Sequence, residues 1–202
     1  MSEKYYNEGW FGKNPTIYEI GSFFIVRLKR KAARKISNKP LKIIDLATGT
    51  GGLGYEMAKL GHEVVGIDLD ENMLAKAHKK TSKDLKLSFL HGDATDLPFE
   101  DNDFDAATIS FAMHDVPDDI GVKILKEARR VVKEDGFIFI LDYNQTESFG
   151  AIFLYYVALL YESPNYKPFA KRDFRNFLEE IGFNIKEKDT FLGAVQMTKL
   201  AW

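Results

Sequence analysis

A glycine-rich segment between a predicted strand and a predicted helix is the first part of this sequence whose residue types point to chemistry. Gly49, Gly51 and Gly54 fit the spacing G-x-G-x-x-G. Glycines at these positions let the backbone turn tightly and come close to a ligand. NAD-dependent oxidoreductases share this spacing with other nucleotide binders. The glycines alone therefore do not separate these proteins from one another, or from a tight turn without a ligand.

Three acidic residues near the ends of predicted strands help to decide which ligand the glycine-rich segment would bind. Asp45 lies just before the glycines, where a carboxylate would repel a pyrophosphate but attract the ammonium and sulfonium of S-adenosylmethionine. Asp68 ends the next strand, where it can accept from both hydroxyls of a ribose, as acids in NAD sites also do. Asp93 and Ala94 follow the third strand, where a carboxylate and a backbone N–H can reach adenine. Together these residues favour the methyl donor over NAD.

The elements that must position these residues alternate between strands and helices. Continuous apolar runs predict strands at 41–47, 62–68, 85–92, 104–112 and 136–143. Helical spacing predicts helices at 16–37, 70–82, 117–133, 148–161 and 171–181, and one between the glycines and residue 60. Two short strands at 183–188 and 194–202 read as an antiparallel hairpin at the sheet edge. Apolar strands separated by helices form a parallel sheet covered on both faces.

The bulk properties fit one ordinary globular domain. The 202 residues carry a net charge of −2 and include no cysteine, which excludes disulfides and thiolate chemistry. No group of histidines and carboxylates has metal-ligand spacing, so we predict no metal. We expect a cytoplasmic protein, because no stretch has the features of a signal peptide or the ~20 apolar residues of a spanning helix. The charge, and the lack of an Asn/Asp-Pro-Pro-Tyr/Phe motif, argue against a nucleic-acid partner.

Four motifs stand in order within about residues 41–143: IIDLATGTGGLG, VVGIDLDENML, LHGDATDLPFEDNDFDAATIS and RVVKEDGFIFILDY. They resemble the motifs of class I S-adenosylmethionine-dependent methyltransferases, most closely the C-methyltransferases of ubiquinone and menaquinone biosynthesis. The resemblance implies S-adenosyl-L-methionine as cofactor and a Rossmann-like α/β sheet of seven strands, mostly parallel with an antiparallel C-terminal strand. It places donor contacts at Thr50, Asp68, Asp93, Ala94 and Ser110 and at the backbone of Gly49 and Gly51. To these we add Asp45 and Leu69.

We therefore predict a single methyltransferase domain over residues 1–202. Residues 1–40 would form a helical cap, 41–143 the donor-binding core, and 144–202 the acceptor-side helices and hairpin. Two features depart from the quinone enzymes. Met113-His114-Asp115 stands where they typically carry Arg-Asn, and the region after the fifth strand is shorter. The acceptor stays open, and the alternatives are an NAD-dependent oxidoreductase or a donor-binding protein without catalysis.

Three residues are candidates for catalysis. Methyl transfer from a sulfonium is an in-line displacement, so orientation and exclusion of water supply most of the rate. A base is needed only if the acceptor loses a proton. His114 follows the fourth strand and is of the residue type suited to that role at neutral pH; the alternative is a polar loop residue before a helix. Asp142 and Tyr143 follow the fifth strand and are predicted to line the acceptor pocket.

Two aromatic-rich segments, 1–28 and 149–166, lie outside the motifs. We predict that they close over a small, apolar or lipid-like acceptor; the alternative is a plain extension of the core. A basic run without acids occupies residues 23–39. Such a run is either a solvated helix face or a surface for peripheral contact with anionic lipid.

Overall fold

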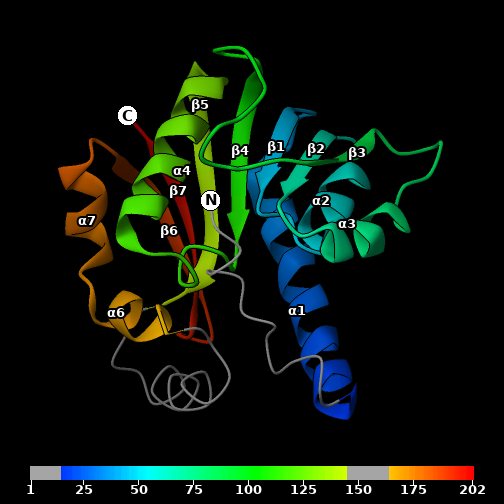
Figure 1. Cartoon of the computed structure of the whole chain (residues 1–202), viewed down its shortest axis with the longest axis horizontal. Helices are drawn as coiled ribbons and strands as arrows, with labels where there is room; N and C mark the ends of the chain where they lie inside the picture. Colours follow the sequence, from blue (N-terminus) through cyan, green and yellow to red (C-terminus); the bar gives the residue numbers. More distant parts are fainter. Residues whose placement is uncertain (1–14, 145–163) are drawn as a thin grey trace.

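The chain is described by a computed structural model over residues 15–144 and 164–202, with side chains from residue 25 onward. The described residues form a seven-stranded sheet in the order β3-β2-β1-β4-β5-β7-β6, with helices around it (Figure 1). The strands are β1 (Lys42–Leu46), β2 (Glu63–Asp68), β3 (Leu87–His91), β4 (Phe104–Ser110), β5 (Val132–Tyr143), β6 (Asn184–Phe191) and β7 (Val195–Ala201). The helices are α1 (Pro15–Ile36), α2 (Gly52–Ala58), α3 (Glu71–His78), α4 (Asp118–Val131), α6 (Tyr166–Lys171) and α7 (Phe174–Glu180). The predicted helix at 148–161 and the aromatic residues before residue 15 lie outside the described residues.

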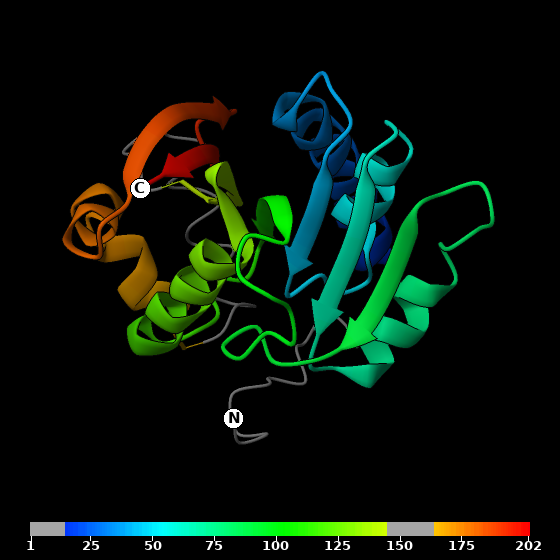
Figure 2. The ribbon, with the colours of Figure 1, turned by 90° about the horizontal axis from the view of Figure 1, so that it is seen from above.

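The first five strands run parallel and the last two form the predicted hairpin. β1 pairs in parallel with β2 and with β4, β2 with β3, and β4 with β5. β7 is antiparallel to both β5 and β6. Figure 2 shows the twist of the sheet from one edge to the other. The predicted sheet is confirmed, and its strand order reverses between β1 and β4, which is where such sheets bind ligands at their carboxyl ends.

Both faces of the sheet are buried, which explains the continuous apolar runs of its strands. Successive side chains of a strand point to opposite faces, so Ile43 and Ile44 of β1 enter different clusters. Ile44 packs with residues of α4 and α7. Ile43 packs with residues of α1, α2 and α3. A strand covered on both sides has no polar face, and its sequence shows no alternation.

Local signals locate some element ends and miss others. Asp70 caps α3 as predicted, accepting from the N–H groups of Asn72 and Met73. The predicted start of β5 at residue 136 is wrong, because the strand begins at Val132, directly after α4. Val132 pairs with Phe104 across an irregularity in the β4–β5 register. Strand pairing thus overrides the helical spacing that the sequence shows up to residue 133. The short helix α6 was not predicted either.

The basic run of α1 does not form one solvated face. Arg30 pairs with Glu56 at 3.1 Å, and Lys35 pairs with Asp189 at 2.6 Å. The Nζ of Lys31 lies 5.0 Å from the centre of the Phe191 ring. Several of its cations therefore hold α1 against α2 and the C-terminal hairpin.

Candidate donor and acceptor site

The glycine loop joins β1 to α2 and twice adopts the left-handed backbone conformation. Gly49 has a φ of 56° and Gly51 a φ of 71°, values that residues with a Cβ rarely adopt. A Cβ at Gly51 would lie 2.4 Å from the ring of Phe89, whereas a Cβ at Gly49 would meet nothing within 4 Å. Packing against β3 therefore requires Gly51. Gly49 borders open space through which a ligand can approach the backbone.

The carboxylate of Asp68 ties this loop to the start of α3. Its Oδ2 accepts from the N–H of Gly49 at 2.6 Å, and its Oδ1 accepts from the N–H of Asp70 at 2.9 Å. The residue is 3% exposed. These contacts hold the carboxylate at the carboxyl end of β2, which is the position expected for an acid that binds ribose hydroxyls.

Asp45 is fully buried beneath the loop. Its Oδ1 accepts from the hydroxyl of Thr108 and its Oδ2 from the hydroxyl of Thr48, each at 2.6 Å. Burial raises the pKa of Asp45, although both hydrogen bonds and the nearby ammonium of Lys29 act in the opposite direction. Each oxygen accepts one of these hydrogen bonds and keeps further acceptor capacity, so the carboxylate can act on a cationic ligand directly, through its charge or through water.

The remaining predicted donor residues lie after β3 and β4. The Oδ1 of Asp93 accepts from the N–H and the hydroxyl of Thr95 at 2.8 and 2.7 Å, which orders the turn that contains the buried Ala94. Ser110 ends β4, and its buried hydroxyl has no hydrogen-bond partner in the described part of the chain. A buried hydroxyl without a partner is unfavourable. Such a group fits a site in which the ligand supplies the partner.

Two backbone carbonyls of the donor loops are held by side chains that sequence reasoning did not assign. The Nζ of Lys80 donates to the carbonyl of Thr50 at 2.7 Å. The Nε2 of His91 lies 3.1 Å from the carbonyl of Leu69. Both contacts fix the backbone on either side of the expected donor position.

The structure brings His114, Asp142 and Tyr143 together. Asp142 is fully buried, and its carboxylate accepts from the backbone N–H of Met113 at 3.0 Å and of Tyr143 at 2.8 Å. The Nδ1 of His114 lies 2.7 Å from the same carboxylate. Because an ionised carboxylate only accepts, Nδ1 carries a proton and Nε2 is the basic nitrogen. That Nε2 lies 3.5 Å from the carboxylate of Asp115.

Aromatic rings surround the imidazole of His114. Ring centres of Tyr143, Tyr166 and Phe169 lie 4.8, 5.9 and 6.2 Å from it. Tyr166 and Phe169 come from α6; Tyr166 belongs to the aromatic segment predicted to cover the acceptor, whereas Phe169 was not predicted at the site. The result is a 2%-exposed histidine held by a carboxylate within an aromatic enclosure.

Two carboxamides stand at the same corner. Gln196 lies opposite Asp142 in the β5–β7 pair, and its Nε2 donates to the carbonyl of Tyr143 at 3.0 Å. The Nδ2 of Asn144 donates to the carbonyl of Gly193 at 3.0 Å. The side-chain oxygens of both are buried and have no hydrogen-bond donor among the described residues. This corner therefore offers two acceptors for hydroxyl or N–H groups.

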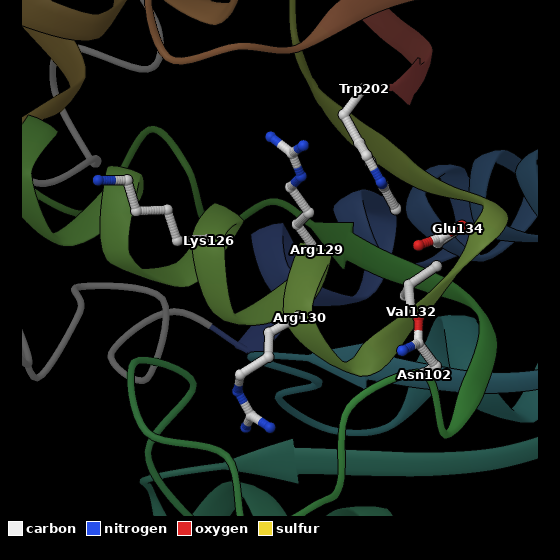
Figure 3. Close-up of a pocket in the computed structure, with 7 residues that line it drawn as sticks. All are labelled: Asn102, Lys126, Arg129, Arg130, Val132, Glu134 and Trp202. Carbon is white, nitrogen blue, oxygen red and sulfur yellow. The ribbon is translucent and has the colours of Figure 1, made fainter.

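A hollow of about 570 Å³ lies elsewhere, where α4 ends and β5 begins at Val132. Figure 3 shows that its cations Lys126, Arg129 and Arg130 point in different directions. The guanidinium of Arg130 is already bound by Glu127 at 2.8 Å. Without convergent groups, this hollow lacks the features of a binding site.

Comparison with known proteins decides the family. A family model described as a methyltransferase domain matches residues 43–136. The demethylmenaquinone methyltransferase of Staphylococcus saprophyticus is 35% identical over 185 residues, covering 88% of this chain and 78% of that protein. The chain belongs to the class I S-adenosylmethionine-dependent methyltransferases. Its cofactor is S-adenosyl-L-methionine, as predicted, and the NAD-dependent alternative is not favoured.

Two further comparisons agree with the assignment of this chain to the methyltransferases. The demethylmenaquinone methyltransferase of Bacillus subtilis is 34% identical over 185 residues, covering 80% of this chain and 78% of that protein. A crystal structure of a SAM-dependent methyltransferase from Aquifex aeolicus has a TM-score of 0.66 and 20% identity, covering 85% of this chain and 88% of that one. This second likeness concerns the fold alone.

The residues of this methyltransferase fit the donor. Gly49 leaves space for close approach, the hydroxyl of Ser110 lacks a partner in the described chain, and Asp68 is held in place at the loop. Within residues 15–144 and 164–202, no three His, Cys, Asp or Glu side chains gather as a metal site requires. No helix in those ranges is long and apolar enough to cross a membrane.

Replacing Asp68 with alanine is expected to weaken the binding of S-adenosylhomocysteine by about 1.5–3 kcal/mol, the range for a hydrogen bond to a charged group. Calorimetric titration measures this change. Asp70→Ala is the matched control, because Asp70 caps α3 from the same loop. It should lower the stability by ~1 kcal/mol and leave the affinity unchanged. Equal affinities of Asp68→Ala and the wild type would contradict the donor role.

Proposed function

We propose that this methyltransferase acts on an apolar aromatic acceptor that bears a hydroxyl group. The observation that carries the proposal is the buried pair of His114 and Asp142. A base contributes when the acceptor must lose a proton, as a hydroxylated ring does when it becomes a stronger nucleophile. The rings of Tyr143, Tyr166 and Phe169 offer faces and edges for packing an aromatic body. By name, the curated relatives methylate demethylmenaquinone, an acceptor of this apolar kind.

In the proposed mechanism the bound donor supplies an electrophilic methyl group. The Nε2 of His114 accepts the proton of the acceptor hydroxyl, while Asp142 holds the imidazole through Nδ1. The transferred proton then lies near the carboxylate of Asp115, which has the opposite charge. The buried oxygens of Asn144 and Gln196 accept from O–H groups of the acceptor and orient its ring. Alignment with the methyl group provides the main rate gain.

Two parts of the domain would then serve the two substrates. Residues 41–143 hold the donor through the glycine loop and the strand ends, as the cluster of Gly49, Asp68 and Ser110 suggests. Residues 144–202 complete the acceptor site through α6 and β7. Of the cap predicted at 1–40, the structure describes α1, whose amino-terminal half extends beyond that edge of the sheet (Figure 1).

A peripheral contact of α1 with a lipid surface is part of the proposal. Ile25 and Val26 are 39% and 46% exposed, and a helix with exposed apolar and basic residues can lie in a membrane interface. The pairing of Arg30 and Lys35 within the protein leaves fewer cations for lipid than the sequence suggests. The contact would bring an apolar acceptor to the enzyme.

The test is a transfer assay with labelled S-adenosylmethionine under anaerobic, reducing conditions. Naphthalene-1,4-diol with an alkyl tail should be methylated, whereas ethanolamine and imidazole should not. Presenting the diol in phosphatidylglycerol vesicles should raise the rate over phosphatidylcholine vesicles if α1 contacts anionic lipid. Transfer to the small amines alone would refute the aromatic acceptor. Donor binding without transfer to any of these probes would favour a donor-binding protein without catalysis.

A further inference from the structure

Lys29 of α1 lies against the glycine loop rather than on the basic surface. A Cβ at Gly52 would stand 3.2 Å from its Cδ and 3.4 Å from its Nζ, so the side chain runs along the first turn of α2. Burial lowers the pKa of Lys29, while the nearby Asp45 acts in the opposite direction. Among the described residues its ammonium has no hydrogen bond and no ion pair. A half-buried ammonium of this kind favours an anionic partner.

The charges around Lys29 do not supply that partner. Asp45 attracts it, but the oxygens of this carboxylate accept from Thr48 and Thr108. Lys80 repels it from the other side of the loop. Two ammonium groups therefore flank a loop whose ligand itself carries a sulfonium and an amino group. Only an anionic part of that ligand can lie favourably between them.

We propose that Lys29 binds the carboxylate of the amino-acid moiety of the methyl donor. This carboxylate is the donor's one anionic group at neutral pH. The buried charge of Asp45, which also attracts Lys29, complements the donor's amino group at a distance or through water. The two side chains thus present opposite charges to the two charged groups of the amino acid. The inference concerns the donor alone and does not depend on the acceptor proposed above.

A purely structural role makes a different prediction. If Lys29 served only to balance the charge of Asp45, its loss would destabilise the loop and weaken every ligand of the site equally. If it binds the donor carboxylate, its loss matters only for ligands that carry this group. The comparison therefore needs two ligands that differ in the carboxylate alone.

The experiment is calorimetric titration of the full chain with S-adenosylhomocysteine and with its decarboxylated analogue, which keeps the amine. The wild type should bind the analogue about 10- to 100-fold more weakly, the range for a charge-assisted hydrogen bond. Lys29→Met should bind S-adenosylhomocysteine more weakly by a similar factor and bind the analogue as the wild type does. Lys29→Arg, which keeps the charge, should retain most of the discrimination.

A control variant separates the outcomes. Arg34→Met removes an exposed cation of the same helix and should change neither affinity. An equal loss of both ligands in Lys29→Met would overturn the proposal. So would a wild type that does not discriminate. Failure of the wild type to bind either ligand would instead contradict the donor site as a whole.

Discussion

Replacing His114 with asparagine is expected to lower the turnover of methyl transfer by about 10²- to 10⁴-fold, the usual contribution of a general base. Asparagine is polar and of similar width, but it cannot take up a proton. The affinity for S-adenosylhomocysteine should stay nearly unchanged, because His114 contacts Asp142 and the aromatic rings rather than the glycine loop. Single-turnover kinetics with the alkylated naphthalenediol measures the effect on the transfer step.

A matched control separates loss of the base from general damage. His78 is an exposed histidine of α3 that contacts the ring of Phe89, and His78→Asn should transfer methyl at the normal rate. Asp142→Asn should also slow the reaction, because an amide no longer fixes the protonated Nδ1 of His114. Normal turnover of His114→Asn would show that His114 is a polar loop residue and not the base.

Truncating Phe89 to alanine is expected to destabilise the fold by about 3–5 kcal/mol, as for other buried aromatic residues. Its ring occupies the space above two glycines. A Cβ at Gly66 would lie 2.5 Å from the ring, and one at Gly51 would lie 2.4 Å from it. For a chain of this size the melting temperature should fall by roughly 6–20 °C. Calorimetric or circular-dichroism melting measures the shift.

The shared space between the Phe89 ring and Gly66 can be tested with a pair of substitutions. Gly66→Ala should cost about 1–3 kcal/mol through overpacking, and it should cost less when Phe89 is already leucine. Leu90→Ala is the control, because this neighbour on β3 is 44% exposed and should change the stability by less than ~0.5 kcal/mol. Strictly additive effects of the Gly66 and Phe89 substitutions would show that the two sites do not share the space.

Local signals in the sequence were sufficient to locate the acids of the candidate donor site at strand ends. Asp68 stands at the end of a continuous apolar run, and in a parallel sheet such ends gather at one edge. Asp70 could be recognised as a helix cap because capping depends on neighbours two and three residues away. The identity of these residues follows from short-range pattern, and the structure places them at the same edge.

The candidate acceptor site depends on contacts between distant segments. His114 meets Asp142 across 28 residues, and Gln196 stands opposite Asp142 only because β7 inserts beside β5. No spacing in the sequence encodes that register. Lys29 is a different case, because a signal was present. It stands three and four residues before Ala32 and Ala33, which are fully buried, so helical periodicity assigns it to the inner face of α1.

The position of β7 between β5 and β6 has a consequence for synthesis on the ribosome. β5 is synthesised before β7, so one edge of β5 stays without its neighbour until residues 195–201 emerge. An unpaired apolar edge strand is a template for association with other chains. β6 emerges earlier but has no partner in the sheet before β7 arrives. Nascent chains stalled before residue 195 should therefore be the aggregation-prone species, and the emergence of β7 is the step that joins β5 and β6 into one sheet.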